Sequence, residues 1–379
     1  MSQKIFTRDF VLAFFAQVAF SFVFHLLIPT LPVYLSRLGS AEVEIGLLVG
    51  IFGFTSVAFR PLIGKALLRT NEKHFMIAGS LLQALASVAY LFTSLFWPML
   101  IVRVIHGIGF ALFHTATITL IAHIGAGSRR GQIISYFSLA MNLAGAAAPP
   151  VGVFLIDRFS FTVLFLVCGV LSLLSLSVAY RLGTRQVDDL QDRVAEGLPL
   201  LSRKVLPSSI ISCLALFVWG ALAAFFPLFA IARGVGNPGL FFTVLAVTLI
   251  LGRALGGRIL DLYNKERIIL PCLLTSIISM VILAFSETQL MFIVVAAIWG
   301  AGQAFLMPSL MLHALERVGS SAGPAMGTFT AVTDLGIFLG PLTMGIVIHF
   351  TSYPTMFLCL ALIGLVNLGY FHFFVRTKG

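Results

Sequence analysis

The chain has 379 residues, of which 59% are hydrophobic and only 10% are charged. A soluble domain cannot bury so many apolar side chains, because its own surface must stay largely polar. Composition therefore excludes an ordinary soluble enzyme or binding domain. The net charge of +10 at pH 7 would indicate a nucleic-acid partner only if the basic residues formed one surface, so their distribution matters.

Twelve stretches of about 18 or more mostly apolar residues predict twelve membrane-spanning helices. In chain order they cover residues 10–32, 45–67, 75–95, 98–123, 132–155, 161–180, 208–230, 240–260, 268–285, 290–312, 324–349 and 354–374. The first is longer than the apolar region of a secretory signal and lacks a small-residue cleavage pattern, so we expect it to remain as a helix. The predicted fold class is an all-α integral membrane protein.

The basic residues concentrate on one side of these predicted helices. With the N-terminus placed in the cytoplasm, 18 of the 24 Lys and Arg residues fall in inside segments, and the outside loops hold Arg37, Arg158 and Arg233. This is the positive-inside pattern. It predicts cytoplasmic termini in the plasma membrane, the inner membrane of a bacterium, and it leaves no basic surface for nucleic acid.

The four cysteines predict packing rather than chemistry. Each stands alone in a predicted helix, so neither a disulfide framework nor a CxxC metal site is available (Cys168, Cys213, Cys272 and Cys359). We read them as small apolar packing residues. We expect no metal and no cofactor.

The sequence nearly repeats on either side of the charged segment 181–207, which we interpret as a cytoplasmic linker. Seven pairs of residues are each 193 positions apart: Arg60 and Arg253, Gly64 and Gly257, Lys65 and Arg258, Asn71 and Asn264, Gly107 and Gly300, Gly109 and Gly302, and Gly152 and Gly345. Pro32 and Pro227 are 195 positions apart. A nearly constant offset across four helices predicts two duplicated six-helix bundles, residues 1–180 and 208–379. Repeated halves with a site between them are a frequent transporter plan.

The loop after the second predicted helix, "GKALLRTNEK", resembles the cytoplasmic gate motif of the major facilitator superfamily, G-x-x-x-D-R-x-G-R-[RK]. The matching residues are Gly64, Arg69 and Lys73, while Leu68, Asn71 and Glu72 depart from the motif. In the second half, Asp261 restores the acid four residues after Gly257. The resemblance therefore gives Gly64, Arg69, Lys73, Gly257 and Asp261 a gating role, with the first-half charge relay altered at Leu68.

Two further segments resemble the same superfamily. "RVIHGIGFA" is similar to the fourth-helix motif R-x-x-Q-G-x-G-x-A, with His106 in place of the glutamine. "GAAAPPVG" is similar to the antiporter motif G-P-x-x-G, where Pro149 and Gly152 match and Ala148 replaces the first glycine. The resemblance covers the whole chain and implies a twelve-helix transporter of two six-helix bundles, similar to proton antiporters for drugs and metabolites.

Polar and aromatic residues on four predicted helices are the candidates for substrate binding. The resemblance implies that the first, fourth, seventh and tenth helices line the cavity. The candidates there are Gln17, Ser21, His25, Arg103, His106, Phe110, His114, Trp219, Phe226, Trp299, Gln303 and Met307. Aromatic, amide and hydroxyl groups suit a largely apolar ligand with a few hydrogen-bonding points. Ordinary helix packing is the alternative, above all for the Phe and Met side chains and for Ser21.

The fourth predicted helix carries its polar residues on one arc. At 100° per residue, Arg103, Phe110 and His114 lie within about 40° of one another, and His106 lies about 60° from Arg103. The stripe is about 16 Å long. The two histidines can relay protons or hold an anionic or metal-chelating substrate, but their spacing does not predict a dedicated metal site. Arg103 stays protonated and can balance either an anionic ligand or Asp334.

Asp334 is the only carboxylate well inside a predicted helix. Counted from Pro324 it lies about 15 Å deep, near the middle of the membrane. We interpret Asp334 as the proton carrier, with Arg103 and His106 as its partners in proton coupling; a purely structural ion pair is the alternative.

These features predict a secondary active transporter that works by alternating access, with proton-coupled efflux of a small organic molecule favoured. A uniporter or proton symporter that takes up a small metabolite or organic anion is the alternative. An intramembrane enzyme would need a nucleophile and base, or a metal set such as HExxH, which the sequence lacks. The expected partners are the substrate, protons and the lipid bilayer, and we expect a monomer.

Overall fold

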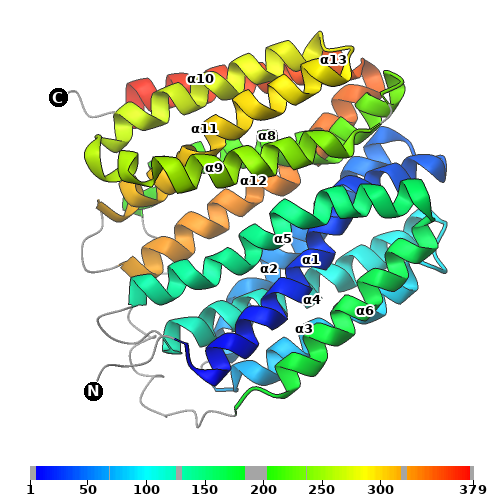
Figure 1. Cartoon of the computed structure of the whole chain (residues 1–379), viewed down its shortest axis with the longest axis vertical. Coiled ribbons are helices and arrows are strands. Elements are labelled where there is room, and N and C mark those ends of the chain that lie inside the picture. The colour runs from blue at the N-terminus through cyan, green and yellow to red at the C-terminus, as the bar shows by residue number, and fades with distance from the viewer. Residues whose placement is uncertain are drawn as a thin grey trace. The chain divides into compact units, whose positions relative to one another are not determined.

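The computed structural model describes residues 6–67, 69–124, 130–183, 203–235, 237–316 and 322–375. Nearly all of these residues are helical, and no strand occurs among them (Figure 1). The long helices are α1 (Arg8–Arg37), α2 (Glu42–Ala66), α3 (Glu72–Ala89), α4 (Phe96–Ile124), α5 (Arg130–Arg158), α6 (Phe161–Tyr180), α8 (Leu206–Ala232), α9 (Gly239–Leu262), α10 (Lys265–Ala284), α11 (Gln289–Glu316), α12 (Ala322–Phe350) and α13 (Tyr353–Tyr370). A short 3-10 turn, η2 (Arg203–Val205), precedes α8, and a π-helical turn, η3 (Phe371–Val375), follows α13.

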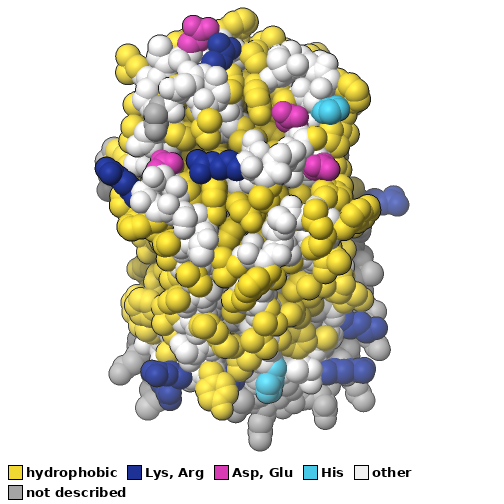
Figure 2. All heavy atoms as spheres, turned by 90° about the vertical axis from the view of Figure 1, so that its right-hand side faces the viewer, with side chains coloured by type: hydrophobic (Ala, Val, Ile, Leu, Met, Phe, Trp, Pro, Cys, Tyr) yellow, Lys and Arg dark blue, Asp and Glu magenta, His cyan; other side chains and the backbone are white. Residues whose placement is uncertain are grey.

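The predicted all-α membrane architecture is confirmed. Within the described part of the chain, ten helices are long and apolar enough to cross a membrane. The other two predicted spans are also helices: α3, which begins with the charged residues Glu72 and Lys73, and α9, whose side chains are described only as far as Arg253. On the face drawn in Figure 2, hydrophobic side chains make up most of the surface and charged ones are scattered. Such a surface suits a lipid environment.

Helix α3 ends earlier than the sequence predicts. The apolar pattern extends to residue 95, but the helix stops at Ala89. Hydropathy does not mark this end because apolar residues continue beyond it. The hydroxyl of Tyr34 lies 3.4 Å from the carbonyl oxygen of Tyr90 and 3.3 Å from that of Thr93, and it donates to these groups. A side chain from α1 thus satisfies carbonyls that would otherwise continue the helix.

The chain forms two compact units. Unit 1 contains Met1–Tyr34 and Ile51–Gly197, and unit 2 contains Leu35–Gly50 and Leu198–Gly379. Each has an aromatic core: Phe20 stacks on Phe113 in unit 1, and Phe226 stacks on Phe241 in unit 2, both with ring centroids 3.9 Å apart. The predicted bundle limits, 1–180 and 208–379, and the role of 181–207 as a linker stay predictions.

The first turns of α2 belong to unit 2 because they pack closely on α12. A methyl group added to Gly50 would lie 2.9 Å from the carbonyl oxygen of Phe338, and one added to Gly46 would overlap the carbonyl oxygen of Pro341. Glycines allow two membrane helices to approach until their backbones touch. The same helix therefore contributes to unit 2 before residue 51 and to unit 1 after it.

The internal repeat is visible in how two helices pack in each unit. In unit 1, Gly107 of α4 lies against α2, where a methyl group would overlap the carbonyl oxygen of Phe52. In unit 2, Gly300 of α11 lies against α9, where a methyl group would lie 3.3 Å from the carbonyl oxygen of Leu245. Gly107 and Gly300 are 193 residues apart, and so are Phe52 and Leu245. Each glycine thus contacts the equivalent residue of its own unit.

A second pair of contacts follows the same offset. A methyl group on Gly109 of α4 would lie 3.1 Å from the carbonyl oxygen of Gly79 in α3. One on Gly302 of α11 would lie 3.3 Å from the carbonyl oxygen of Cys272 in α10. The repeat read from the sequence therefore describes two units with the same helix contacts, made at small residues.

The two units also begin equivalent helices in the same way. Asn71 caps α3, where its side-chain oxygen accepts a 3.0 Å hydrogen bond from the backbone N–H of Lys73. Asn264 caps α10 by a 3.1 Å hydrogen bond from the backbone N–H of Glu266. An asparagine at this position satisfies one of the free N–H groups of the first helical turn.

Candidate transport site

A buried polar network connects α3 and α4 in unit 1. The guanidinium of Arg103 is 3.4 Å from the hydroxyl of Tyr90, and that hydroxyl is 3.0 Å from Nδ1 of His106. The guanidinium carbon also lies 4.6 Å from the ring centroid of Phe52, a cation–π distance. Tyr90, Arg103 and His106 are all at most 5% exposed. Two of the predicted site residues are therefore joined by a tyrosine.

The donors and acceptors in this network fix the most favourable arrangement of protons. Arginine can only donate, so the hydroxyl oxygen of Tyr90 accepts from Arg103. The O–H of Tyr90 then donates to Nδ1 of His106, which places the proton of the neutral imidazole on Nε2. In the described part of the chain no group pairs with that Nε2, although it is buried. The network thus ends in one unsatisfied polar atom.

Tyr90 is a site residue that the sequence analysis missed. It lies just after the end of α3, inside an apolar run, where no polar pattern distinguishes it. Its ring stacks on Phe165 of α6, with centroids 5.2 Å apart, and its carbonyl accepts from Tyr34. The only signal in the sequence was a tyrosine inside a predicted span, which usually requires a hydrogen-bond partner.

Three residues of the predicted arc on α4 contact the same aromatic side chain, Phe52 of α2. The ring of Phe52 lies 5.0 Å from the ring of His106 and 5.4 Å from that of Phe110, besides its contact with Arg103. His114 continues the stripe, 5.3 Å from Phe110, and is only half-buried. The structure therefore brings the polar residues of α4 together with an aromatic wall from α2.

The candidates on α1 form a ladder of hydrogen bonds within the helix. The amide nitrogen of Gln17 donates to the hydroxyl of Ser21 at 2.6 Å, and Nδ1 of His25 lies 2.8 Å from the carbonyl oxygen of Ser21. Gln17 and Ser21 are buried, and His25 is half-buried. The side-chain oxygen of Gln17 is buried without a partner among the described residues. This is a second unsatisfied polar atom in unit 1.

The antiporter-like segment of α5 packs on α1 beside this ladder. A methyl group on Gly145 would lie 3.2 Å from Nε2 of His25, and one on Gly152 would lie 2.9 Å from the carbonyl oxygen of Leu26. Pro149, between the two glycines, is buried. The segment therefore brings α5 close enough to determine where the His25 ring can lie.

The candidates in unit 2 separate into two groups. Trp219 of α8 and Trp299 of α11 stack with ring centroids 5.3 Å apart, and Gln303 lies one turn from Trp299. By contrast, Phe226 is fully buried against other phenylalanines of the core, and Met307 is partly buried against a second apolar cluster. The tryptophan pair is thus set apart from the packing residues.

Asp334 lies in the middle of α12 and is half-buried. It is one turn before Phe338 and therefore on the helix face that contacts α2 in unit 2. Its neighbour Thr333 is buried, and the side-chain oxygen of Thr333 forms no hydrogen bond with a described residue. Asp334 is thus held in the middle of a packed helix, and its depth in the membrane stays a prediction.

The gate-motif residues of the first half lie at the ends of helices. The ammonium of Lys73 donates a 2.8 Å hydrogen bond to the carbonyl oxygen of Leu182 and lies 5.2 Å from the ring of Tyr180, so it joins α3 to the end of α6. Gly64 is in open space, and Arg69 is exposed. Leu68, the surroundings of Gly257 and the side chain of Asp261 fall outside what the structure describes.

A contact between an acidic and a basic side chain joins two helices at equivalent places in the two units, with the acid and the base exchanged. In unit 1, Nδ1 of His123 in α4 is 2.5 Å from the carboxylate of Glu72 in α3. In unit 2, the ammonium of Lys265 in α10 is 2.7 Å from the carboxylate of Glu316 in α11. Glu72 and Lys265 are 193 residues apart, as are His123 and Glu316. Both units therefore join these two helices at the same place, but the acid lies on the first helix in unit 1 and on the second helix in unit 2.

With the fold and these contacts established, comparisons with known proteins can be interpreted. The sequence profile of the Major Facilitator Superfamily matches residues 13–323 and 210–379. The chain belongs to the Major Facilitator Superfamily. It is therefore a membrane-spanning secondary transporter and not an enzyme, and it handles a small-molecule substrate within the membrane.

Members of the superfamily resemble the chain over most of its length. The staphylopine export protein of Staphylococcus aureus (strain Mu50) is 25% identical over 347 residues, which cover 87% of this chain and 86% of that protein. Among solved structures, the nucleoside transporter NupG has a TM-score of 0.78 at 14% identity, covering 98% of this chain and 100% of its own. A D-xylose–proton symporter has a TM-score of 0.76 at 17% identity, with 97% and 98% covered. The two structures share the fold.

Proposed function

We propose that this superfamily member is a proton-coupled exporter of a small organic molecule, located in the plasma membrane with both termini in the cytoplasm. The observation that carries the proposal is the buried Arg103–Tyr90–His106 network. An imidazole whose Nε2 has no partner among the described residues can hold a group that enters the protein or exchange a proton with it. A titratable group within the membrane is expensive to bury and therefore usually serves a function.

Asp334 is the proposed proton carrier. Its test is an Asp334→Asn variant reconstituted in vesicles, because an amide keeps the shape of the carboxylate but cannot release a proton. We expect uptake driven by a pH gradient to fall at least tenfold, while exchange of labelled for unlabelled substrate continues. Glu287→Gln serves as the control, because Glu287 is an exposed acid that pairs with Arg233. Undiminished transport driven by the pH gradient would overturn this role.

His106 is proposed to take part in proton coupling in addition to Asp334. Glutamine occupies this place in the family motif, so His106→Gln removes the titratable group with little change in hydrogen-bonding capacity. We expect substrate binding to be retained and transport to depend less on pH. An unchanged pH profile would limit His106 to holding the substrate or the network.

Export is favoured by two observations. The antiporter-like segment of α5 packs directly on α1, where Gly145 faces His25. The staphylopine export protein, similar over most of the chain, is an exporter by name. The direction is tested by loading vesicles with substrate and recording lumenal pH during efflux. Proton antiport acidifies the lumen, whereas proton symport makes it more alkaline, and that second result would contradict the proposal.

Uptake of an organic anion is the second candidate function, by uniport or proton symport. Arg103 favours it, because a permanent cation buried at 5% exposure inside a membrane protein suits an anionic ligand. A substrate that enters with its proton and binds more weakly to Arg103→Gln would favour this function. For either function we propose that a single chain contains the complete transport site and works as a monomer.

A further inference from the structure

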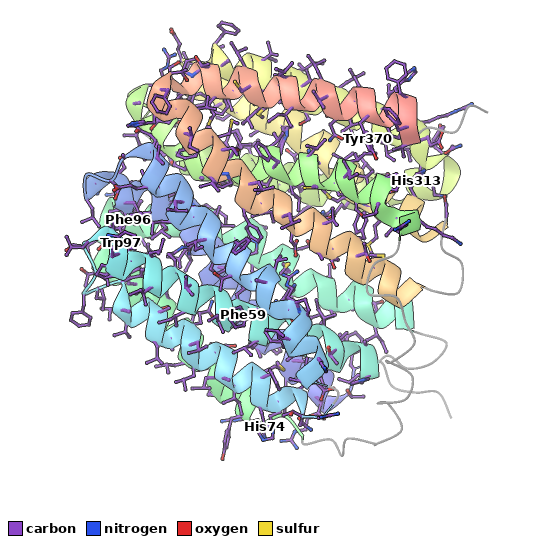
Figure 3. All side chains as sticks on the ribbon, turned by 180° about the vertical axis from the view of Figure 1, so that it is seen from behind. Phe59, His74, Phe96, Trp97, His313 and Tyr370 are labelled. Atoms are coloured by element: carbon purple, nitrogen blue, oxygen red, sulfur yellow. The ribbon has the colours of Figure 1, made fainter. Side chains whose placement is uncertain are left out.

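The stacked tryptophans of unit 2 lie at the middle of two long helices. Trp219 is the fourteenth of the 27 residues of α8, and Trp299 is the eleventh of the 28 residues of α11. Their ring planes meet at 20°, with centroids 5.3 Å apart, so the indoles form an offset stack. The third tryptophan of the chain, Trp97, stands 72% exposed at the start of α4 (Figure 3). Its position is typical of an aromatic residue at the membrane–water interface.

Packing alone does not account for this pair. Trp299 is 2% exposed, yet its indole N–H has no partner among the described residues. A buried tryptophan N–H usually has one, because an unsatisfied donor destabilises the fold. Phe226, two turns along α8 from Trp219, provides the comparison: it is fully buried and lies within 6 Å of three phenylalanine rings. Phe226 is therefore an ordinary apolar packing residue, with no polar side-chain atom that needs a partner.

Trp219 differs from Phe226 because it remains partly exposed. The pair thus consists of one indole that is fixed in the core and one that keeps accessible surface at membrane depth. Gln303, one turn from Trp299 on α11, adds an amide at 9% exposure. An aromatic pair with an amide one helical turn away, and with an indole N–H that has no partner among the described residues, matches a planar ring better than a flexible aliphatic chain.

We infer that the Trp219–Trp299 pair is a stacking platform for a planar aromatic or heteroaromatic ring of the transported molecule. This inference rests on the proposed function, since it names the substrate class of the same site. The ring stacks on the accessible surface of Trp219 and extends the existing stack by one ring.

The test compares aromatic probes with their saturated counterparts on purified full-length protein. One pair, 2-naphthoate and decahydro-2-naphthoate, carries an anionic group; the other, benzylamine and cyclohexylmethylamine, carries a cationic group. In at least one pair we expect the aromatic member to bind more tightly. Trp219→Leu should weaken its binding about twofold to tenfold and leave the saturated member within about twofold. Trp219→Phe should weaken binding of the aromatic member less than Trp219→Leu does, and Trp97→Leu should change the binding of neither member.

Two results would overturn the inference: aromatic probes that bind no better than saturated ones in both pairs, or a Trp219→Leu variant that weakens both members equally. Trp219→Met repeats the measurement with a different apolar side chain if the leucine variant does not fold. Lumenal pH measurements separate this inference from the proposed function. A ring preference without proton movement would refute only proton coupling, whereas proton-coupled transport without a ring preference would refute only the platform.

Discussion

The Tyr90→Phe substitution tests the buried network most directly. It removes the one oxygen that both Arg103 and His106 contact, and it keeps the ring that stacks on Phe165. Tyr90 is completely buried, so water does not replace the lost hydroxyl without a rearrangement. The change therefore isolates the hydrogen bonds from the packing.

The expected magnitude follows from the two distances. The 3.4 Å contact with Arg103 is beyond the usual range of a strong hydrogen bond, whereas the 3.0 Å contact with His106 is within it. Leaving one buried partner unsatisfied costs about 1 to 3 kcal/mol in soluble proteins, but hydrogen bonds between membrane helices average about 0.6 and reach about 1.7 kcal/mol. We expect the free energy of unfolding to fall by about 1 to 2 kcal/mol.

The assay is reversible unfolding in mixed micelles, arranged as a double-mutant cycle with His106→Leu. If Tyr90 and His106 share a hydrogen bond, their effects should be coupled by more than about 0.5 kcal/mol. Tyr263→Phe, at an exposed tyrosine after α9, is the control and should change the free energy of unfolding by less than about 0.5 kcal/mol. Additive effects of Tyr90→Phe and His106→Leu would refute the network.

Three further predictions concern helix packing and helix ends. Gly107→Ala should destabilise the protein by about 1 to 3 kcal/mol in the same unfolding assay, because its methyl group would overlap a carbonyl oxygen of α2, whereas Gly64→Ala, in open space, should not. Equal effects of the two alanines would contradict this packing. Asn71→Ala should cost about 1 kcal/mol through loss of the α3 cap, whereas Asn71→Ser, which keeps a capping oxygen, should lose much less; equal losses would argue against the cap. Lys265→Glu and Glu316→Lys should each lower the free energy of unfolding by about 0 to 1 kcal/mol, and the double variant, in which the charges are exchanged, should recover this loss. A double variant less stable than both single variants would refute the pairing.

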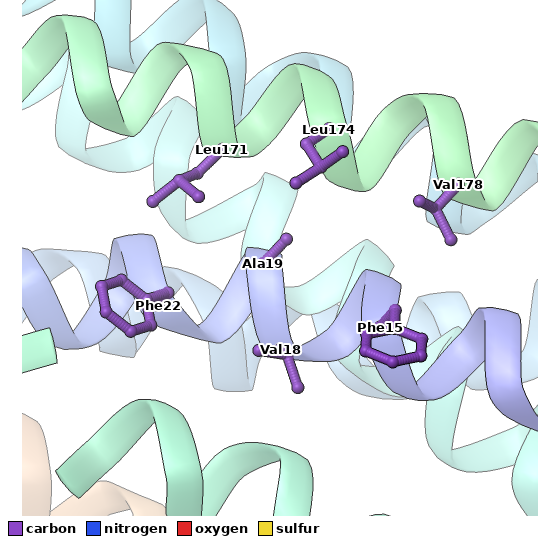
Figure 4. Close-up of a pocket in the computed structure, with 7 residues that line it drawn as sticks. All are labelled: Phe15, Val18, Ala19, Phe22, Leu171, Leu174 and Val178. Atoms are coloured by element: carbon purple, nitrogen blue, oxygen red, sulfur yellow. The ribbon is translucent and has the colours of Figure 1, made fainter. Parts of the chain in front are cut away.

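An apolar groove on unit 1 shows which features hydropathy predicts and which it does not. Figure 4 shows Leu171, Leu174 and Val178 of α6 facing α1, where Phe15 and Phe22 also border the groove. The sequence predicts both helices from their apolar content alone. It does not predict the space between them, because that depends on which side chains of α1 and α6 meet.

The sequence alone predicted the twelve long helices, the internal repeat and the polar arc of α4. Lipid tolerates only long apolar helices, so spans are visible in composition, and a duplicated gene keeps its small residues where helices touch, as Gly107 and Gly300 do. The side of α4 that carries Arg103 and His106 follows from helical geometry. All of these are properties of one helix or of a constant spacing along the chain.

Tertiary structure decided what lies between helices. Tyr90 became a site residue only because α3 packs on α4, which places its hydroxyl 3.0 Å from Nδ1 of His106. The carbonyl oxygen of Tyr90 in turn accepts from the hydroxyl of Tyr34, 56 residues away in the chain. The stacking of Trp219 on Trp299 joins residues 80 positions apart. Hydrogen bonds and ring contacts of this kind depend on distances in space, which apolar patterning along the chain does not specify.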